Sequence, residues 1–239
     1  MKVGRLDSVR NVDRGGDAGM KLTYYGHACF VLESDGASIL IDPFNEQVGY
    51  KFPDVAPTAV VVSHDHFDHQ HVQVAKGTPR IIRGLREGGK EWATVDERVG
   101  PLKITTVRTY HDTSRGSERG KNAMWIFEGE GLRVVHAGDL GHTLSQDQVA
   151  ALGQVDVLML PIGGYYTIGP KEADTVIGQV HPRVVIPMHY RTEVNKDWPI
   201  GPVDEFLRGK GRVKRLERTS TLLAAALPED QEIWVLRHA

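Results

Sequence analysis

Residues 59–69 read AVVVSHDHFDH, and this stretch decides the fold. Its first four residues form a continuous apolar run, which is typical of a strand that is buried on both faces. Residues 64–69 then hold three imidazoles and two carboxylates. Both groups are usual ligands of zinc, manganese and iron. The stretch therefore predicts a metal site at the end of a central strand.

Length and composition are those of a globular protein. The chain has 239 residues, of which 40% are hydrophobic, enough to bury the core of one large domain. The formal net charge of −2 gives no reason to expect a nucleic acid or an anionic membrane as partner. The single cysteine, Cys29, reads as a buried thiol and excludes an internal disulfide, which agrees with a cytoplasmic location.

The chain divides into a short extension and one domain. Residues 1–19 carry alternating charges and few large apolar side chains, so we expect a peripheral extension and neither a secretory signal nor a membrane segment. Residues 20–239 read as one domain. Strands are expected at 22–25, 29–32, 38–41, 59–63, 81–82, 102–109, 123–127, 133–136, 155–160, 184–187 and 232–235, and helices at 70–75, 145–152, 171–179 and 203–209. This order predicts two packed sheets with helices outside.

Metal-binding side chains also follow other expected strands. His111 follows the strand at 102–109, Asp139 the strand at 133–136, and His189 the strand at 184–187, while Asp42 ends the strand at 38–41. Strand ends at one edge of a sheet can converge, and rigid strands hold ligands to the tolerance that a metal needs. The positions of these residues therefore favour one shared site.

This ordered set resembles the metallo-β-lactamase fold superfamily. The superfamily signature His-x-His-x-Asp-His is matched by residues 64–69, and its later His, Asp and His by His111, Asp139 and His189. The motifs at 25–27, 41–43 and 186–190 look like a branch of uncharacterised metal-dependent hydrolases that is similar to L-ascorbate-6-phosphate lactonase. The resemblance implies an α/β (α+β) fold, a four-layer αββα sandwich.

The resemblance also implies a binuclear centre. One ion would be bound by His64, His66 and His111, the other by Asp68, His69 and His189, with Asp139 bridging the two and Asp42 orienting a ligand. Imidazoles and few carboxylates leave two cations with net positive charge, so a water that bridges them loses a proton near neutral pH. The resulting hydroxide would be the nucleophile, and Asp68 could accept the proton of the water.

Further residues near this set are candidates for catalysis or substrate contact. His27 could position substrate or donate a proton, or could simply cap a turn. His142 is the candidate acid for the leaving group, with a role in starting the next helix as the alternative. Arg119, in a polar segment after His111, could clamp a phosphate or carboxylate; the alternative is that this segment is only a solvated loop. Tyr165 and Tyr166 could line the pocket, or could serve only in packing. His136, inside an apolar strand, is expected to be a satisfied core residue.

The sequence thus predicts a binuclear metal-dependent hydrolase. Two divalent ions, zinc or manganese with iron as a third option, would serve to cleave a lactone or ester bond of a small anionic metabolite. Two alternatives stay open: a phosphodiesterase or nuclease of the same fold, and a non-catalytic metal-binding adaptor. The composition argues against a nucleic-acid partner, and the complete ligand set argues against the adaptor. A homo-oligomer agrees with base rates for soluble proteins.

Overall fold

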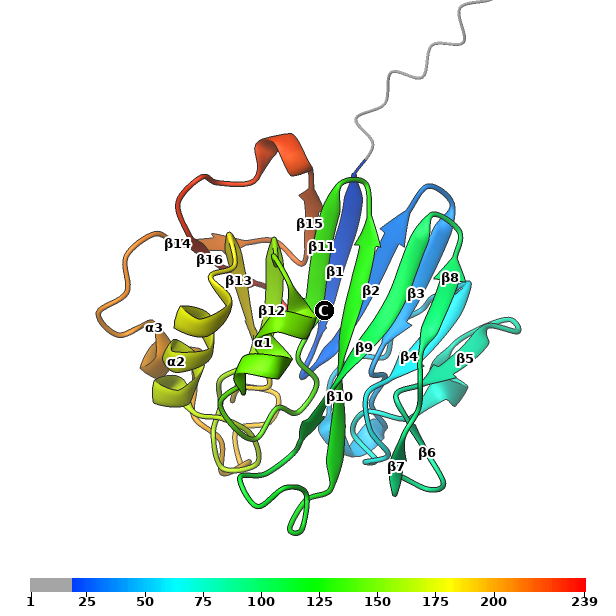
Figure 1. The fold of residues 1–239 in the computed structure, drawn as a ribbon, viewed down its shortest axis with the longest axis horizontal. Coiled ribbons are helices and arrows are strands. Elements are labelled where there is room, and N and C mark those ends of the chain that lie inside the picture. Colours follow the sequence, from blue (N-terminus) through cyan, green and yellow to red (C-terminus); the bar gives the residue numbers. More distant parts are fainter. Residues whose placement is uncertain (1–18) are drawn as a thin grey trace, which may run out of the picture.

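Two large β-sheets pack face to face in the computed structural model, which describes residues 19–239 (Figure 1). The six-stranded sheet has the order β15-β1-β2-β3-β4-β5, and the eight-stranded sheet the order β14-β16-β13-β12-β11-β10-β9-β8. The first sheet contains β1 Met20–Gly26, β2 Cys29–Ser34, β3 Ala37–Ile41, β4 Ala59–Val62, β5 Arg80–Arg83 and β15 Thr219–Leu222. The second contains β8 Asp96–Val99, β9 Leu102–Tyr110, β10 Lys121–Gly129, β11 Leu132–His136, β12 Val157–Pro161, β13 Val184–Met188, β14 Val213–Leu216 and β16 Glu232–Leu236. A small hairpin pairs β6 Leu85–Arg86 with β7 Glu91–Trp92.

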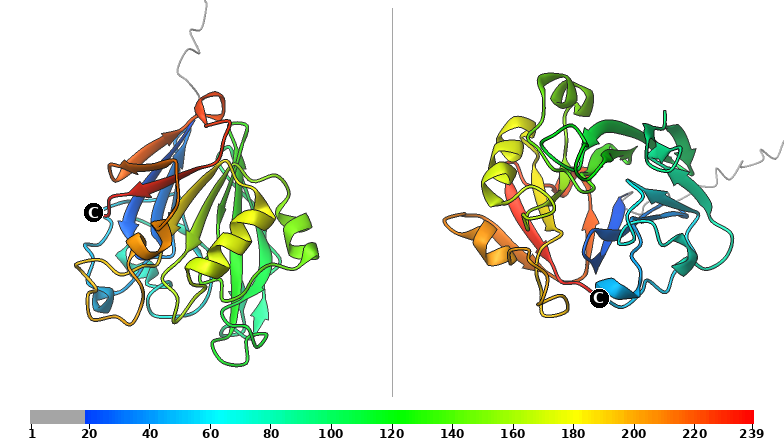
Figure 2. Two further views of the ribbon diagram at one scale, coloured as in Figure 1. Left: turned by 90° about the vertical axis from the view of Figure 1, so that its left-hand side faces the viewer. Right: turned by 90° about the horizontal axis from the view of Figure 1, so that it is seen from below.

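Three α-helices belong to the half of the chain that builds the eight-stranded sheet: α1 Gln146–Leu152, α2 Pro170–Val180 and α3 Val203–Leu207. Figure 2 shows α1 and α2 on the side of that sheet that faces away from the six-stranded sheet. Helix α1 begins with a capping box, in which the Ser145 side chain accepts from the Gln148 amide and Gln148 accepts from Ser145. Helix α2 has Pro170 in its first turn and buries Ala173, Val176, Ile177 and Val180, a spacing that gives it one apolar face.

The main hydrophobic core lies between the sheets and continues beneath α1 and α2, and a second, smaller cluster covers the outer face of the six-stranded sheet. That cluster consists of Cys29, Val31, Leu40, Phe44, Val48, Tyr50 and Val60. The chain between β3 and β5 covers it with two 3-10 turns, η1 Glu46–Val48 and η2 Val72–Val74. A third such turn, η3 Ala224–Ala226, follows β15. The mixed α/β class and the buried Cys29 are confirmed, but the expected helix at 70–75 is only a 3-10 turn.

The topology places several strand ends at one edge of the molecule. Strands β3, β4 and β5 run parallel in one sheet, and β11, β12 and β13 run parallel in the other. Carboxyl ends of parallel strands meet at the same edge of a sheet, which is where open α/β folds bind their ligands. No helix of residues 19–239 is both long and apolar enough to cross a membrane. The prediction for residues 1–19 lies outside the described residues apart from Gly19.

Candidate metal centre

A first group of metal-binding side chains consists of His64, His66 and His111. One ring nitrogen of each lies within 4.8 Å of the others. His64 Nε2 and His66 Nδ1 are 3.1 Å apart, as for two ligands aimed at one point. His64 Nδ1 lies 2.9 Å from the Ser63 hydroxyl, which leaves Nε2 of His64 free to coordinate. Two of these imidazoles follow β4 and the third follows β9, so the two sheets build the group together.

A second group consists of His27, Asp68, His69 and His189, whose ligand atoms also lie within 4.8 Å of one another. Nδ1 of His69 donates to Oδ2 of Asp42 at 3.0 Å, which fixes the ring orientation and leaves Nε2 of His69 bare. The Asp42 position matches its expected supporting role. His189 follows β13, and the backbone of His189 donates to the His27 carbonyl at 2.8 Å.

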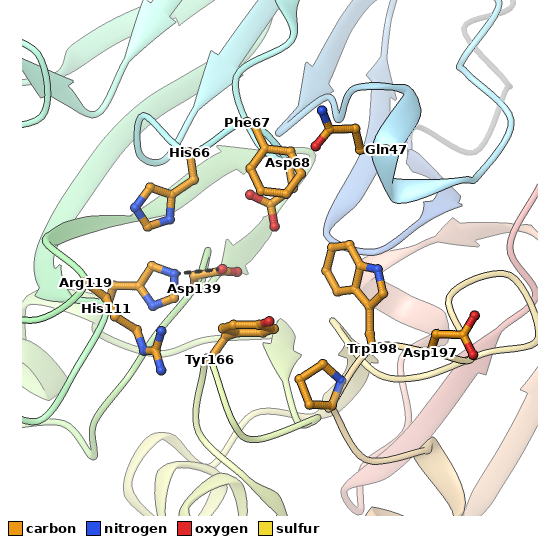
Figure 3. A pocket seen from close by; sticks show the side chains of 11 residues that line it. Gln47, His66, Phe67, Asp68, His111, Arg119, Asp139, Tyr166, Asp197 and Trp198 are labelled. Atoms are coloured by element: carbon orange, nitrogen blue, oxygen red, sulfur yellow. Dashed lines mark ion pairs between the residues drawn. The ribbon is translucent and has the colours of Figure 1, made fainter.

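Asp139 lies between the two groups. Its Oδ2 is 3.0 Å from Nε2 of His111, in the first group, and 3.3 Å from Nε2 of His189, in the second. Figure 3 draws the first of these contacts at the floor of a pocket. The Asp139 amide donates to Oδ1 of Asn122 at 3.1 Å, and that side chain is itself held by the Ala137 carbonyl. The structure therefore brings all seven expected ligands together, with Asp139 at the expected central position.

Buried polar atoms at this centre lack the partners that a folded protein normally provides. Nε2 of His69 and Oδ1 of Asp139 lie 3.2 Å apart, and neither has a hydrogen-bond partner among the described residues. Burying such atoms without a partner is costly. A divalent cation between them would supply that partner for both. The chemistry of the donor set, imidazoles and carboxylates without cysteine, suits zinc, manganese or iron.

The electrostatics of the centre favour the metal-binding forms of His64, His27 and Asp139. Burial alone would lower the pKa of His69, but the carboxylates of Asp139 and Asp68 raise it well above its ordinary value. Burial lowers the pKa of His64 well below its ordinary value and that of His27 to about 4, which keeps both imidazoles neutral. Burial alone would raise the pKa of Asp139, but the imidazoles around it hold the pKa well below the usual range. Neutral imidazole and ionised carboxylate are the forms that bind a cation.

Close backbone packing brings the strand ends together. A Cβ added to Gly141 would lie 2.2 Å from the carbonyl carbon of His111, so only glycine allows the loop after β11 to touch the end of β9. Asp42, His189 and His27 all have left-handed backbone conformations, with φ of 45°, 52° and 56°. Such residues cluster at functional sites, where the surrounding structure holds them in place.

A pocket of about 620 Å³ opens over the centre (Figure 3). It is lined by Gln47, His66, Phe67, Asp68, His111, Arg119, Asp139, Tyr166, Asp197, Trp198 and Pro199. Arg119 thus lies where the sequence predicted it. Its guanidinium is 5.3 Å from the ring centroid of Tyr166, and its Nη2 donates to the Tyr165 carbonyl at 3.2 Å. Of the two tyrosines predicted to line the pocket, Tyr166 does so, whereas Tyr165 is 65% exposed and lies outside the lining.

Two other sequence predictions do not fit the geometry. His27 is fully buried and does not line the pocket; its Nε2 lies 3.0 Å from Oδ2 of Asp68, so the predicted contact with substrate is wrong. His142 lines a separate pocket, where its Nε2 accepts from the Tyr110 amide at 3.1 Å and its Nδ1 lies 2.7 Å from the Thr143 carbonyl. With both nitrogens bound to backbone, His142 is not placed to protonate a leaving group.

Sequence reasoning missed two aromatic residues of the pocket, Trp198 and Phe67. Trp198 comes from the loop between β13 and α3, and nothing in its local sequence marks it as part of the site. Phe67 could have been found, because it stands between two ligands of the first motif and is 48% exposed despite its apolar ring. Both side chains face the same cavity as the metal-binding groups.

Known proteins are similar to this chain in sequence and in fold. Residues 21–189 match the family model of the beta-lactamase superfamily domain. Over 195 residues the chain is 34% identical to a UPF0173 metal-dependent hydrolase of Methanopyrus kandleri and 35% identical to one of Pyrobaculum islandicum, which covers 72% of this chain and 85% of each relative. A crystal structure from Thermotoga maritima, described as a candidate zinc-dependent hydrolase of the metallo-β-lactamase superfamily, is 38% identical with a TM-score of 0.74, covering 92% of this chain and all of that one.

The chain therefore belongs to the beta-lactamase superfamily, among its UPF0173 metal-dependent hydrolases. This membership confirms the superfamily, the fold and the hydrolase class that the sequence predicted.

Proposed function

We propose that this protein is a binuclear hydrolase that cleaves a lactone or ester bond of a small anionic metabolite. The position of Asp139 carries the proposal. Its carboxylate contacts an imidazole from each group of metal-binding side chains, His111 on one side and His189 on the other. A carboxylate shared in this way is what two neighbouring divalent ions need, because it lowers the repulsion between them.

Each ion would have its own set of ligands. His64, His66 and His111 would hold the first, and Asp68, His69 and His189 the second, with zinc or manganese as the main candidates and iron as a third. When bound, two such ions acidify a water that they share, which can then act as nucleophile, and polarise the carbonyl that it attacks.

The side chains of the pocket would do the rest. Three aspartates line the pocket, Asp68, Asp139 and Asp197. His27 lies behind Asp68 and contacts its carboxylate, so this carboxylate is held in position to accept a proton from the attacking water. The orienting contact comes from a fully buried imidazole, which supports a fixed geometry.

The pocket lining supports a small anionic substrate. Among the described residues that line it, Arg119 is the one permanent cation, and it could form a forked contact with a phosphate or carboxylate. Tyr166 and Trp198 offer aromatic faces for the organic part of the molecule. A nuclease would need a track of cations along its substrate, since each phosphate contact adds to affinity. A phosphorylated lactone, as in the lactonase resemblance, agrees with this pocket.

Two measurements test the proposal. Metal content of untagged protein after extensive dialysis, by elemental mass spectrometry, should approach two ions per chain. The loaded protein should then hydrolyse lactones or aryl esters that carry a carboxylate or phosphate faster than neutral analogues, and faster than bis(p-nitrophenyl) phosphate. Preference for the phosphodiester would favour the phosphodiesterase alternative. Two bound ions with no turnover of any class would favour the adaptor.

A further inference from the structure

The loop after β9 is organised around one buried carboxylate. Asp112 is 6% exposed, and its side chain accepts hydrogen bonds from four backbone amides. Oδ1 accepts from Ser114 at 2.8 Å and from Gly116 at 2.7 Å, while Oδ2 accepts from Glu118 at 3.1 Å and from Arg119 at 2.8 Å. Hydrogen bonds to an ionised carboxylate are about twice as strong as those between neutral groups. One side chain therefore fixes the path of this loop.

The loop has few other means of keeping its shape. Residues 113–118 are mostly exposed, and Arg115 and Gly116 have left-handed backbone conformations with φ of 57° and 80°. Three backbone hydrogen bonds close it, from Ser117 to Ser114 at 3.3 Å, from Gly120 to Gly116 at 3.1 Å and from His111 to Gly120 at 3.0 Å. The Ser114 hydroxyl also donates to the Glu118 carboxylate. Without the carboxylate at its centre, four amides would lose their acceptor and the loop could adopt other conformations.

Arg119 stands at the end of this loop and is the cation of the pocket. Its backbone amide is one of the four that Asp112 holds, and its guanidinium lies over the ring of Tyr166. The guanidinium also donates to the Tyr165 carbonyl, and it forms no ion pair with a carboxylate of residues 19–239. Its charge is therefore available to a ligand, while both its backbone and its side chain are held in one direction.

Asp112 could instead support the neighbouring metal ligand, but the contacts argue against this. All four hydrogen bonds of its carboxylate go to the loop. Nδ1 of His111, the atom that such a support would bind, is buried and has no hydrogen-bond partner within residues 19–239. The carboxylate thus acts on the loop and on Arg119, not on the imidazole beside it.

We propose that Asp112 is a positioning residue that presents Arg119 to the anionic group of the substrate and so sets the preference for anionic substrates. This inference rests on the proposed hydrolase function. Asp112 touches no substrate itself; it acts through the backbone of the loop. The pre-formed loop spares the enzyme the entropy of ordering Arg119 when substrate binds.

The Asp112→Asn variant tests this with a pair of matched esters, one anionic and one neutral. An amide offers one acceptor oxygen, and its NH2 group would face backbone donors. We expect the KM of the anionic ester to rise on the order of tenfold, with kcat and the KM of the neutral ester little changed. Arg119→Gln should show the same pattern, and the double variant should add little, since both changes remove one interaction.

The direction in which the KM of the anionic ester changes in Asp112→Asn separates a positioning role of Asp112 from a direct effect of its charge. Removing a negative charge near an anion site would by itself lower the KM of the anionic ester, whereas loss of positioning raises it. Glu118→Gln is the matched control, because it removes an exposed charge from the same loop, keeps an acceptor oxygen for the Ser114 hydroxyl and leaves the Asp112 contacts in place. Gly116→Ala is a second route to the same defect: its Cβ would lie 2.9 Å from the Gly120 carbonyl oxygen. Because that oxygen also accepts from the His111 amide at 3.0 Å, metal content is measured in this variant as well.

Hydrogen exchange and metal content give readouts that do not depend on turnover. Amides of residues 114–119 should exchange faster in Asp112→Asn, metal content should stay the same, and inorganic phosphate should bind more weakly by calorimetry. An unchanged or lower KM for the anionic ester, an equal rise for both esters, or loss of metal would overturn the inference. If the wild type hydrolyses no ester, the proposed function fails. Amide hydrogen exchange and the affinity for inorganic phosphate still decide the role of Asp112 in that case.

Discussion

Asp42 accepts a hydrogen bond from Nδ1 of His69 at 3.0 Å, deep in the structure where both side chains are fully buried. The carboxylate of Asp42 is held in turn by the Ser63 amide at 2.8 Å and by the Ser63 hydroxyl. Because Nδ1 of His69 carries the proton of this bond, Nε2 is the ring nitrogen that faces Asp139, 3.2 Å from its Oδ1, and is the one able to bind a metal ion. The tautomer of a metal ligand is thus set from behind by a residue that would not touch the ion.

Asp42→Asn should weaken metal binding without disturbing the backbone. Asparagine tolerates the left-handed conformation of this position, but its amide cannot hold the same tautomer of His69. Loss of such a supporting carboxylate lowers metal affinity by roughly 10- to 100-fold. Competition with a chromogenic chelator measures this. Asp35→Asn, at an exposed turn with φ of 37°, is the matched control and should keep wild-type affinity. Equal affinity in both variants would contradict the role of Asp42.

Asp139→Ala should lose at least one metal ion and nearly all hydrolysis. The substitution removes the carboxylate that contacts both groups of ligands and leaves His111 and His189 facing an empty space. Elemental mass spectrometry of the dialysed variant gives the number of ions per chain, and circular dichroism checks the fold. Retention of both ions and of the full rate would mean that Asp139 does not bridge.

The ligand set could be predicted from sequence because each ligand stands beside a recognisable strand. The buried run of β4 leads directly into His64, and β13 leads into His189, so local pattern alone gives both the residue type and its rigid support. All four residues of β4 are buried, as a continuous apolar run predicts. A metal ligand that follows a strand in this way can therefore be predicted from the local sequence alone.

The walls of the pocket could not be predicted in the same way, because tertiary packing brings them together. Trp198 lines the pocket only because of the path that the loop after β13 takes. His27 lies behind Asp68, where its Nε2 contacts the Asp68 carboxylate, 41 residues away in sequence. Pairing of β1 with β15 joins Met20 to Leu222, a distance in sequence that no local pattern reports. Strand β14 lies at the edge of its sheet and carries Lys214 and Arg215, so its sequence shows no apolar run that would predict a strand.

His142→Ala should leave the dependence of the rate on the leaving group unchanged. The imidazole is bound to the backbone of Tyr110 and Thr143 on the far side of the loop and does not line the substrate pocket. We expect a loss of about 1 kcal/mol in the free energy of unfolding, because the Tyr110 amide loses its acceptor. Rates for a series of aryl esters with leaving groups of different pKa test this. Selective slowing of the poorest leaving groups would restore the acid role predicted from sequence.

His136 makes the stability of the fold sensitive to pH. It is fully buried in β11, where Nε2 donates to the Ala28 carbonyl at 2.8 Å and Nδ1 accepts from the Gly138 amide at 3.1 Å. The prediction of a satisfied core residue is thereby confirmed. Burial lowers the pKa of His136 below its ordinary value of 6.5. A proton on Nδ1 would also face an N–H group, so the folded protein resists protonation at this position.

The sign follows from proton linkage. As pH falls below about 6.5, His136 becomes protonated in the unfolded chain but stays neutral in the folded protein. The free energy of unfolding therefore decreases toward acid pH. His136→Gln keeps a donor for Ala28 but has no such proton uptake. We expect the variant to be less stable than wild type at pH 8, and the difference to shrink by up to about 1.4 kcal/mol per pH unit between pH 6.5 and 5. Denaturant unfolding at a series of pH values measures both proteins; protonation of the metal ligands cancels in the difference. His181→Gln, at an exposed position, serves as control, and a wild-type-to-variant difference that stays constant with pH would show that His136 titrates normally.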